Sequence, residues 1–186
     1  MNDLLQRLAG GTLLSDGDAN AVADDVLQTP TLFPCLFEGL RSPNNVIRAR
    51  TAHALERISR SRPDLLTSHL PTILSYATDP VPMVKWHVAM MLGTLATSQK
   101  EATQVLPVLF EMTKDAEGVF VRSWAIVSLA RIAQTYRDHR DIILVRLRQL
   151  EKDSKASIRG KAVKAVYALE HQTSFPAGWI KDEEPH

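Results

Sequence analysis

Few residues of this sequence are of the types that perform chemistry, and none belongs to a recognisable catalytic group. The single cysteine, Cys35, would need a neighbouring base or positive charge to become a reactive thiolate. The residues that follow it, Leu36 and Phe37, are apolar. We therefore predict that Cys35 packs inside the fold and is not a nucleophile.

The histidines lack the spacing of a metal site. Helical zinc sites use two histidines four residues apart, and no two of the six histidines here are so placed. His53 has an acidic residue, Glu56, three positions later, but this is a single pair. The sequence also has no glycine-rich phosphate loop and no Gly-x-Ser-x-Gly turn. It predicts a protein that is not an enzyme and holds no metal or cofactor. The six histidines are His53, His69, His87, His139, His171 and His186.

The composition is that of an ordinary soluble domain. Of 186 residues, 45% are hydrophobic and 23% are charged, and the formal net charge is +1. This balance excludes wholesale disorder and argues against a generally basic nucleic-acid binder. One cysteine allows no intrachain disulfide. The most apolar stretch, residues 88–96, is about half as long as a membrane-spanning helix, and residues 1–9 lack the apolar core of a signal peptide. We expect a cytoplasmic protein that makes no membrane contact.

One short pattern occurs four times at a constant spacing of 37 residues, which predicts a repeat architecture. The four copies are Ile47-Arg48, Val84-Lys85, Val121-Arg122 and Ile158-Arg159. Apolar residues follow at offsets 5, 8 and 11, which lie on one stripe of a helix. They are Ala52, Leu55, Ile58; Ala89, Leu92, Leu95; Ile126, Leu129, Ile132; and Val163, Val166, Leu169.

Each of these helices is preceded by another apolar stretch and a turn. The turns are Ser42-Pro43, Asp79-Pro80, Asp115-Ala116 and Asp153-Ser154. Proline suits the first turn of a helix but not its interior, so these dipeptides separate two helices. No strand-like alternation of apolar and polar residues is present. The unit is therefore helix, turn, helix, and neighbouring units must cover each other's apolar stripes.

These features resemble the HEAT-repeat family over about residues 31–170. The resemblance depends on the 37-residue period, the Asp-Pro turn, the Val-Arg opening of the second helix, and a proline in the first helix at Pro34, Pro71 and Pro107. It implies an all-α fold, namely a right-handed, armadillo-like α-solenoid of four helix-turn-helix HEAT-like repeats in residues 31–171. We expect residues 1–30 to form an N-terminal helical cap and residues 172–186 to be a C-terminal tail, either loop or disordered.

The family typically has an acid six residues before the basic residue, which forms a ladder of ion pairs between adjacent repeats. Asp79 before Lys85 and Asp153 before Arg159 fit this pattern. The other two copies have Ser42 before Arg48, and Ala116 before Arg122 with Asp115 one residue out of place. The resemblance thus predicts a ladder that is half complete.

The second helices have a side that points away from the buried stripe, at offsets 2, 3, 6, 9, 10 and 13. In HEAT-like repeats this side lines the concave surface. Of the 24 positions, six are Lys or Arg and one, Glu56, is acidic, although the whole chain carries only +1. The candidate partner-binding residues of this concave face are Arg50, His53, Arg57, Trp86, His87, Met90, Trp124, Val127, Arg131, Lys161 and Lys164.

The middle of this face is apolar and its ends are basic, which is typical of a binding groove. Trp86, Met90, Trp124 and Val127 form the middle. The alternative interpretation is that the two tryptophans pack between repeats.

The leading functional hypothesis is a non-catalytic scaffold or binding module whose concave groove grips a peptide or helix of another protein. Its partner would carry an apolar segment flanked by acids. The second hypothesis is a nucleic-acid binder similar to the HEAT-like DNA-alkylation-repair glycosylases. Base excision would require a carboxylate beside the aromatic residues. The acid of the concave face, Glu56, lies at least one repeat from Trp86, which argues against this reaction. A third resemblance, to HEAT-like bilin lyases, has no specific residue in its support.

Overall fold

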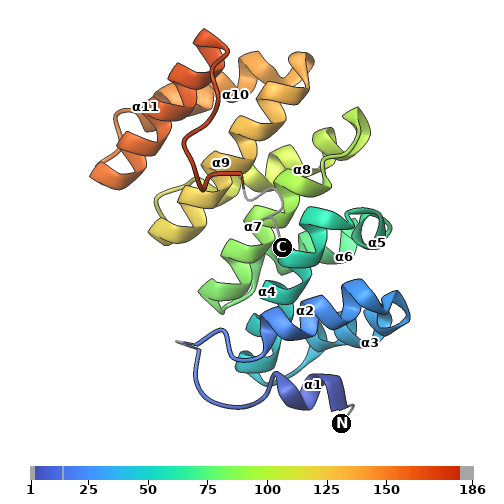
Figure 1. Ribbon diagram of the computed structural model, residues 1–186. Coiled ribbons are helices and arrows are strands. Elements are labelled where there is room, and N and C mark those ends of the chain that lie inside the picture. Colours follow the sequence, from blue (N-terminus) through green and yellow to red (C-terminus); the bar gives the residue numbers. More distant parts are fainter. Residues whose placement is uncertain (1–2, 14, 181–186) are drawn as a thin grey trace. The chain divides into compact units, whose positions relative to one another are not determined.

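The structure is a computed structural model that describes residues 3–13 and 15–180. In this part of the chain every regular element is a helix (Figure 1), so the all-α prediction is confirmed. The chain divides into two compact units, residues 1–91 and 92–186, and the division falls within helix α7 (Pro82–Leu95). The number of repeats and the boundaries after residues 30 and 171 stay predictions.

The first unit contains several short helices and one long one, α4. Pro30, Pro34 and Pro71 each stand at the first or second position of a short helix, where proline's missing N–H is not needed. The first helix of each expected repeat is therefore split into α and 3₁₀ segments here. The elements before α7 are α1 (Asp3–Arg7), α2 (Ala19–Gln28), η1 (Pro30–Leu32), α3 (Phe33–Glu38), η2 (Gly39–Arg41), α4 (Asn45–Ser61), α5 (Asp64–Thr67), α6 (Leu70–Ser75) and η3 (Tyr76–Thr78).

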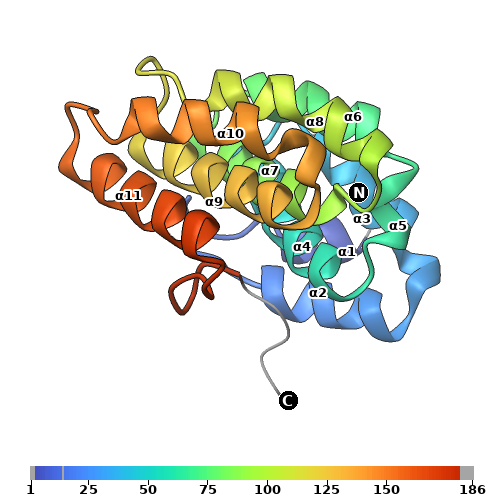
Figure 2. The same cartoon turned by 90° about the horizontal axis from the view of Figure 1, so that it is seen from above.

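The second unit has longer, unbroken helices: α8 (Gln99–Met112), α9 (Val119–Thr135), α10 (Arg137–Leu150) and α11 (Ala156–His171). Helix α9 contacts α8, α10 and α11, and α10 contacts α11. Figure 2 shows α10 and α11 lying beside α9. Helix α9 is thus the central helix of this unit, and α11 presents one side to it.

Side-chain caps fix the starts of two of the long helices. The Asn44 side chain accepts the backbone N–H groups of Val46 at 2.8 Å and Ile47 at 3.4 Å at the start of α4. At the start of α8, the Ser98 hydroxyl accepts the N–H of Glu101 and donates to its carboxylate. Such caps satisfy donors that the first helical turn leaves unpaired, and each contributes about 1 kcal/mol to helix stability.

The apolar positions of the 37-residue pattern are buried, as predicted, with one exception. Leu55, Leu92 and Leu129, at offset 8 in the first three copies, are fully buried. Val163 is 48% exposed, although the residues at offset 5 in the other copies are fully buried. Helix α11 contacts α9 and α10 on one side, and among the described residues no helix follows to cover its other side. The prediction that Val163 is buried is therefore wrong.

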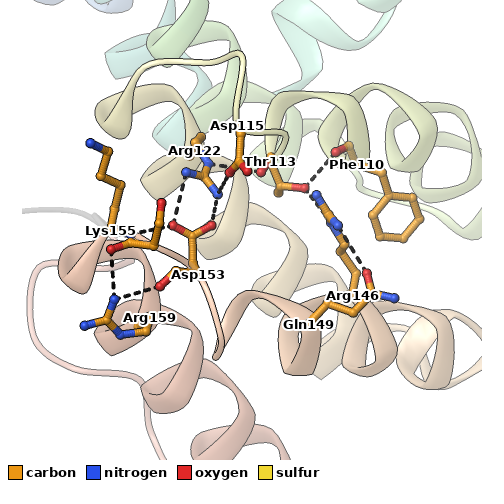
Figure 3. A network of polar contacts seen from close by, with 10 residues as sticks. Phe110, Thr113, Asp115, Arg122, Arg146, Gln149, Asp153, Lys155 and Arg159 are labelled. Atoms are coloured by element: carbon orange, nitrogen blue, oxygen red, sulfur yellow. Dashed lines mark hydrogen bonds and ion pairs between the residues drawn. The ribbon is translucent and has the colours of Figure 1, made fainter.

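Two buried arginine–aspartate pairs join positions 31 residues apart. In the first unit the Arg48 Nε donates to Asp79 Oδ2 at 2.7 Å. In the second, Arg122 donates to both carboxylate oxygens of Asp153 and, at 3.0 Å, to the carbonyl of Thr113 (Figure 3). A separation of 31 is the 37-residue period minus six, so the acid of one copy pairs with the arginine of the preceding copy. Asp79 and Asp153, the two acids that fit the pattern, therefore form ion pairs between adjacent copies, as the ladder predicts. Asp115, one residue out of place, also lies 2.9 Å from Arg122.

The Arg122–Asp153 pair lies inside the second unit, where the two side chains are only 3% and 5% exposed. Burial by itself raises the pKa of Asp153. Hydrogen bonds from Arg122 and from the Lys155 backbone N–H outweigh it, so the pKa lies below its usual range. The carboxylate of Asp153 is therefore held ionised as part of the packing between helices.

Candidate functional site

Arg50, expected at one basic end of the binding face, is buried in the first unit. It is 3% exposed, and its guanidinium donates to backbone carbonyls of the loop before α2. The accepting carbonyls belong to Leu8 at 3.0 Å, Ser15 at 3.1 Å, Thr12 at 3.2 Å, and Gly10. The expected exposure of Arg50 is wrong, because helix periodicity cannot show that this loop covers the start of α4.

The glycines of the same loop were the signal available in the sequence. Gly17 has a φ of +53°, and a Cβ built on it would lie 2.5 Å from the guanidinium carbon of Arg50. Only glycine combines this backbone conformation with so close an approach. The loop and Arg50 are therefore fitted to each other.

Other basic residues of α4 are paired with acids of the same unit. The Arg57 guanidinium lies 3.0 Å from the Asp24 carboxylate of α2. Arg60 lies 2.5 Å from Glu56, a residue only 3% exposed. The positive charge expected at this end of the binding face is thus largely balanced by acids of the same unit.

The histidines of this face lie together and are mostly covered. His53 is half-buried, with its Nδ1 3.4 Å from Asp16 and its Nε2 3.1 Å from Asn20. Its ring lies 4.9 Å from that of His87, which is 6% exposed. The expected exposure of His87 is wrong.

The expected apolar centre is only partly accessible. Met90 and Val127 are 9% and 6% exposed, so both were wrongly placed at the surface. Trp86 and Trp124 are each half-buried, as is Arg131. Each tryptophan is therefore partly packed, as the inter-repeat interpretation expects, and partly accessible, as the groove interpretation expects.

In the second unit, Lys161 of α11 lies between two tryptophan rings. Its Nζ is 5.2 Å from the ring centroid of Trp124 on α9 and 5.2 Å from that of Trp179, beyond α11. Both distances are in the range of cation–π contacts, which are stronger when the cation is desolvated. Burial, followed by the charge of nearby Lys164, lowers the pKa of Lys161.

The segment that supplies Trp179 returns along the second unit after α11 ends (Figure 1, red). Gln172 adopts a left-handed conformation with φ 53°, and the N–H of Thr173 donates to the carbonyl of Ala168 at 3.0 Å. Such a cap reverses the chain direction. Residues 172–180 are thus a loop, one of the two expected alternatives, and the remainder of the expected tail, residues 181–186, lies outside the described residues.

The apolar side chains of this loop face the unit. Phe175, Pro176, Trp179 and Ile180 are half-buried, whereas Ser174 is exposed. The rings of Phe175 and Trp179 stack with centroids 5.9 Å apart. The expected binding face does not include Trp179, although two aromatic residues four positions apart in a polar tail were a usable signal for it.

We call the surface formed by Trp124, Lys161 and Lys164 the α9/α11 surface. Lys164 is exposed and lies one helical turn after Lys161. Tyr167, one turn further along α11, is 56% exposed and stacks on His171, with centroids 4.2 Å apart. This surface combines a half-buried tryptophan with two lysines, and an exposed tyrosine follows Lys164, which is the composition expected of the groove, confined to one unit.

Removing the Trp179 ring is expected to raise the pKa of Lys161 towards its ordinary value. Burial is the main cause of the lowered value, and Trp179→Ala exposes the ammonium to water, which favours its charged form. NMR titration of the lysine side chains would measure the change, with the exposed Lys155 as an internal control. A pKa that stays the same or falls further in the variant would show that Trp179 is not the source of the burial.

The environment of Cys35 is unlike that of a reactive thiolate. Cys35 is half-buried in α3, and burial raises the pKa of its thiol, the opposite of what a nucleophile needs. Within residues 3–13 and 15–180, no three histidine, cysteine or acidic side chains gather as metal ligands. Over the same residues, no helix has the length and apolar character needed to cross a bilayer.

Comparison with known proteins identifies the family. A search of curated proteins gives no match. Among solved structures, a Kap121p mutant is similar over 89% of this chain and 20% of its own, with a TM-score of 0.65 and 18% identity. This likeness shows the fold alone, and the chain spans about a fifth of that protein's length. A family model for HEAT repeats matches residues 33–130, more than half of the sequence and the stretch that contains three of the four pattern copies. The chain belongs to the HEAT-repeat family.

Proposed function

We propose that this protein is a non-catalytic binding module that takes an apolar, acid-flanked segment of another protein on the α9/α11 surface. The observation that carries the proposal is Lys161, held between the rings of Trp124 and Trp179. One of those rings comes from a loop outside the helices, so this surface accommodates an aromatic side chain presented by a non-helical segment.

The composition of the surface supports a protein partner. Tryptophan and tyrosine are enriched among the residues that dominate binding energy in protein interfaces, where truncation of one costs about 2 kcal/mol or more. A half-buried lysine adds about 1 kcal/mol or more when an aromatic ring lies over it. Aromatic anchoring would therefore supply most of the affinity.

The charge of the surface favours acids beside the anchor. Lys161 and Lys164 lie one helical turn apart, close enough for the charge of Lys164 to lower the pKa of Lys161. A segment with acids beside its aromatic residues would relieve this repulsion and would be attracted from a distance.

Binding of nucleic acid is the weaker hypothesis because much of the expected basic surface is used internally. Arg50 is committed to backbone carbonyls, Arg57 to Asp24 and Arg60 to Glu56. These are three of the six basic residues on which the hypothesis depended. Phosphate backbones are bound by accessible positive charge, and neutralised arginines do not release counterions.

Affinity capture from an extract of the source cells tests the proposal with a double variant, Lys161→Glu/Lys164→Glu. We expect the native protein to retain partner proteins after nuclease treatment and the variant to retain them at least about tenfold less, because two attractive charges become repulsive. The matched control is Lys152→Glu/Lys155→Glu, which makes the same charge change at exposed positions of the same unit. It should bind like the native protein.

Two results would contradict the proposal. Release of all bound material by nuclease would favour nucleic acid as the partner. Equal losses in the two double variants, with unchanged melting temperatures, would show that net charge matters and the α9/α11 surface does not.

A further inference from the structure

The loop after α11 has the chemistry that the proposed function expects of a partner. It carries two aromatic residues four positions apart, Phe175 and Trp179, and the sequence continues with the acids Asp182, Glu183 and Glu184. Trp179 already lies over Lys161 in the α9/α11 surface. The chain therefore contains a segment similar to the one it is proposed to bind.

We infer that residues 172–180 are a displaceable internal occupant of the α9/α11 surface, and that the external partner is a segment of the same kind, with two aromatic residues four positions apart followed by acids. This inference rests on the proposed function and names the class of partner. It also implies that the internal segment must leave before the partner binds.

The contacts of the segment are of the kind that can be exchanged. The N–H of Trp179 donates back to the carbonyl of Pro176 in its own loop at 3.2 Å. The ring of Trp179 contacts Lys161, and the apolar side chains of the segment are partly buried. A partner with the same side chains could replace these contacts one for one.

The segment also borders a pocket that is open to solvent. This pocket of about 300 Å³ is lined by Gln134 of α9 together with residues of the loop, including Phe175 and Ile180. Close packing therefore does not extend over the whole segment, and solvent reaches it along one edge.

A tethered segment nevertheless competes strongly. A segment joined to the surface by a few residues has an effective concentration of about 1 mM. If the detached segment binds with a Kd of about 100 μM, the internal copy covers the surface in about ten of eleven molecules and weakens external binding about elevenfold.

A fluorescein-labelled synthetic peptide of residues 172–186, added to full-length protein, tests the inference by fluorescence anisotropy. We expect the double variant Phe175→Ala/Trp179→Ala to bind the peptide about tenfold more tightly than the native protein, because its internal copy no longer competes. The control Ser174→Ala/Ala177→Ser changes exposed positions of the same loop and should bind like the native protein.

One further protein variant and one altered peptide test whether the peptide binds at the α9/α11 surface. Adding Lys161→Glu to the aromatic double variant should remove the gained affinity, and a peptide in which alanine replaces the residue equivalent to Trp179 should bind at least tenfold more weakly. Equal peptide affinity for the native protein and the aromatic double variant, or no binding to either, overturns the inference.

Capture from cell extract separates this inference from the proposed function. In one outcome, the native protein and the aromatic double variant bind the peptide equally while proteins are still captured through the α9/α11 surface. This result would overturn the inference and leave the proposed function intact. Tenfold tighter peptide binding by the aromatic double variant, with no protein captured by either form, would support the internal occupant and count against an external partner in those cells.

Discussion

Replacing Arg122 by alanine is expected to destabilise the second unit by about 3–5 kcal/mol, because it leaves a buried carboxylate without its cation. The side chain of Asp153 is 5% exposed, and Arg122 also donates to the carbonyl of Thr113. Thermal unfolding followed by circular dichroism should show a midpoint about 10 °C lower than that of the native protein.

The acid stability of the same variant gives a second measurement. The pKa of Asp153 is lowered in the native fold, so its contribution to stability is present above about pH 3.9, the ordinary value, and is lost as the pH falls through the lower folded value. Without Arg122 the main cause of the lowering is absent. Between pH 4 and pH 2, the unfolding free energy of Arg122→Ala should therefore fall less steeply than that of the native protein.

Arg148→Ala is the matched control, because Arg148 also pairs with a carboxylate of the second unit. Its partner is Glu170, and the arginine side chain is 58% exposed. Exposed ion pairs contribute little to stability, so the midpoint should be nearly unchanged. Equal effects of the two substitutions would show that burial of the Arg122 pair has no energetic consequence.

Replacing Arg50 by alanine is expected to release the loop before α2 and to cost about 3 kcal/mol, because a charged donor to several buried carbonyls is lost. The carbonyls of Leu8, Thr12 and Ser15 accept from this one guanidinium at 3.0–3.2 Å. Amide hydrogen exchange measured by mass spectrometry should show faster exchange in residues 8–17, and the thermal midpoint should fall.

Two substitutions separate geometry from charge. Arg50→Lys keeps the charge but has no planar fork of donors, so exchange in the loop should still be faster than in the native protein. Arg57→Ala removes an arginine of the same helix whose side chain is 29% exposed, and it should leave the loop protected. Unchanged exchange in Arg50→Ala would mean that other contacts hold the loop.

Much of the fold could be predicted from the sequence because the apolar pattern repeats. The 37-residue spacing placed Leu55, Leu92 and Leu129 at equivalent positions, and all three are fully buried. The ion pairs were harder, because spacing along the chain does not show which acid meets which arginine. Asp153 was recognised by its spacing from Arg159, six residues later, but this spacing did not identify its partner, Arg122, 31 residues earlier.

The candidate site was less predictable because a helical wheel assigns the same exposure to equivalent positions in all four copies of the pattern. It placed Arg50, His87, Met90 and Val127 on an exposed side, and all four are buried. The wheel contains no information about the N-terminal loop that covers Arg50. Lys164 is exposed on α11, the last helix among the described residues, whereas Lys161 is half-buried between two tryptophan rings.

The contacts that hold each unit together also have a consequence for the kinetics of folding. Arg48 and Asp79 lie 31 residues apart, as do Arg122 and Asp153, and Arg50 lies 42 residues from Leu8. The entropy of loop closure rises only slowly with loop length, and both partners of each of these contacts belong to the same unit. Each unit can therefore acquire its ion pairs as soon as its own segment leaves the ribosome, without waiting for distant parts of the chain.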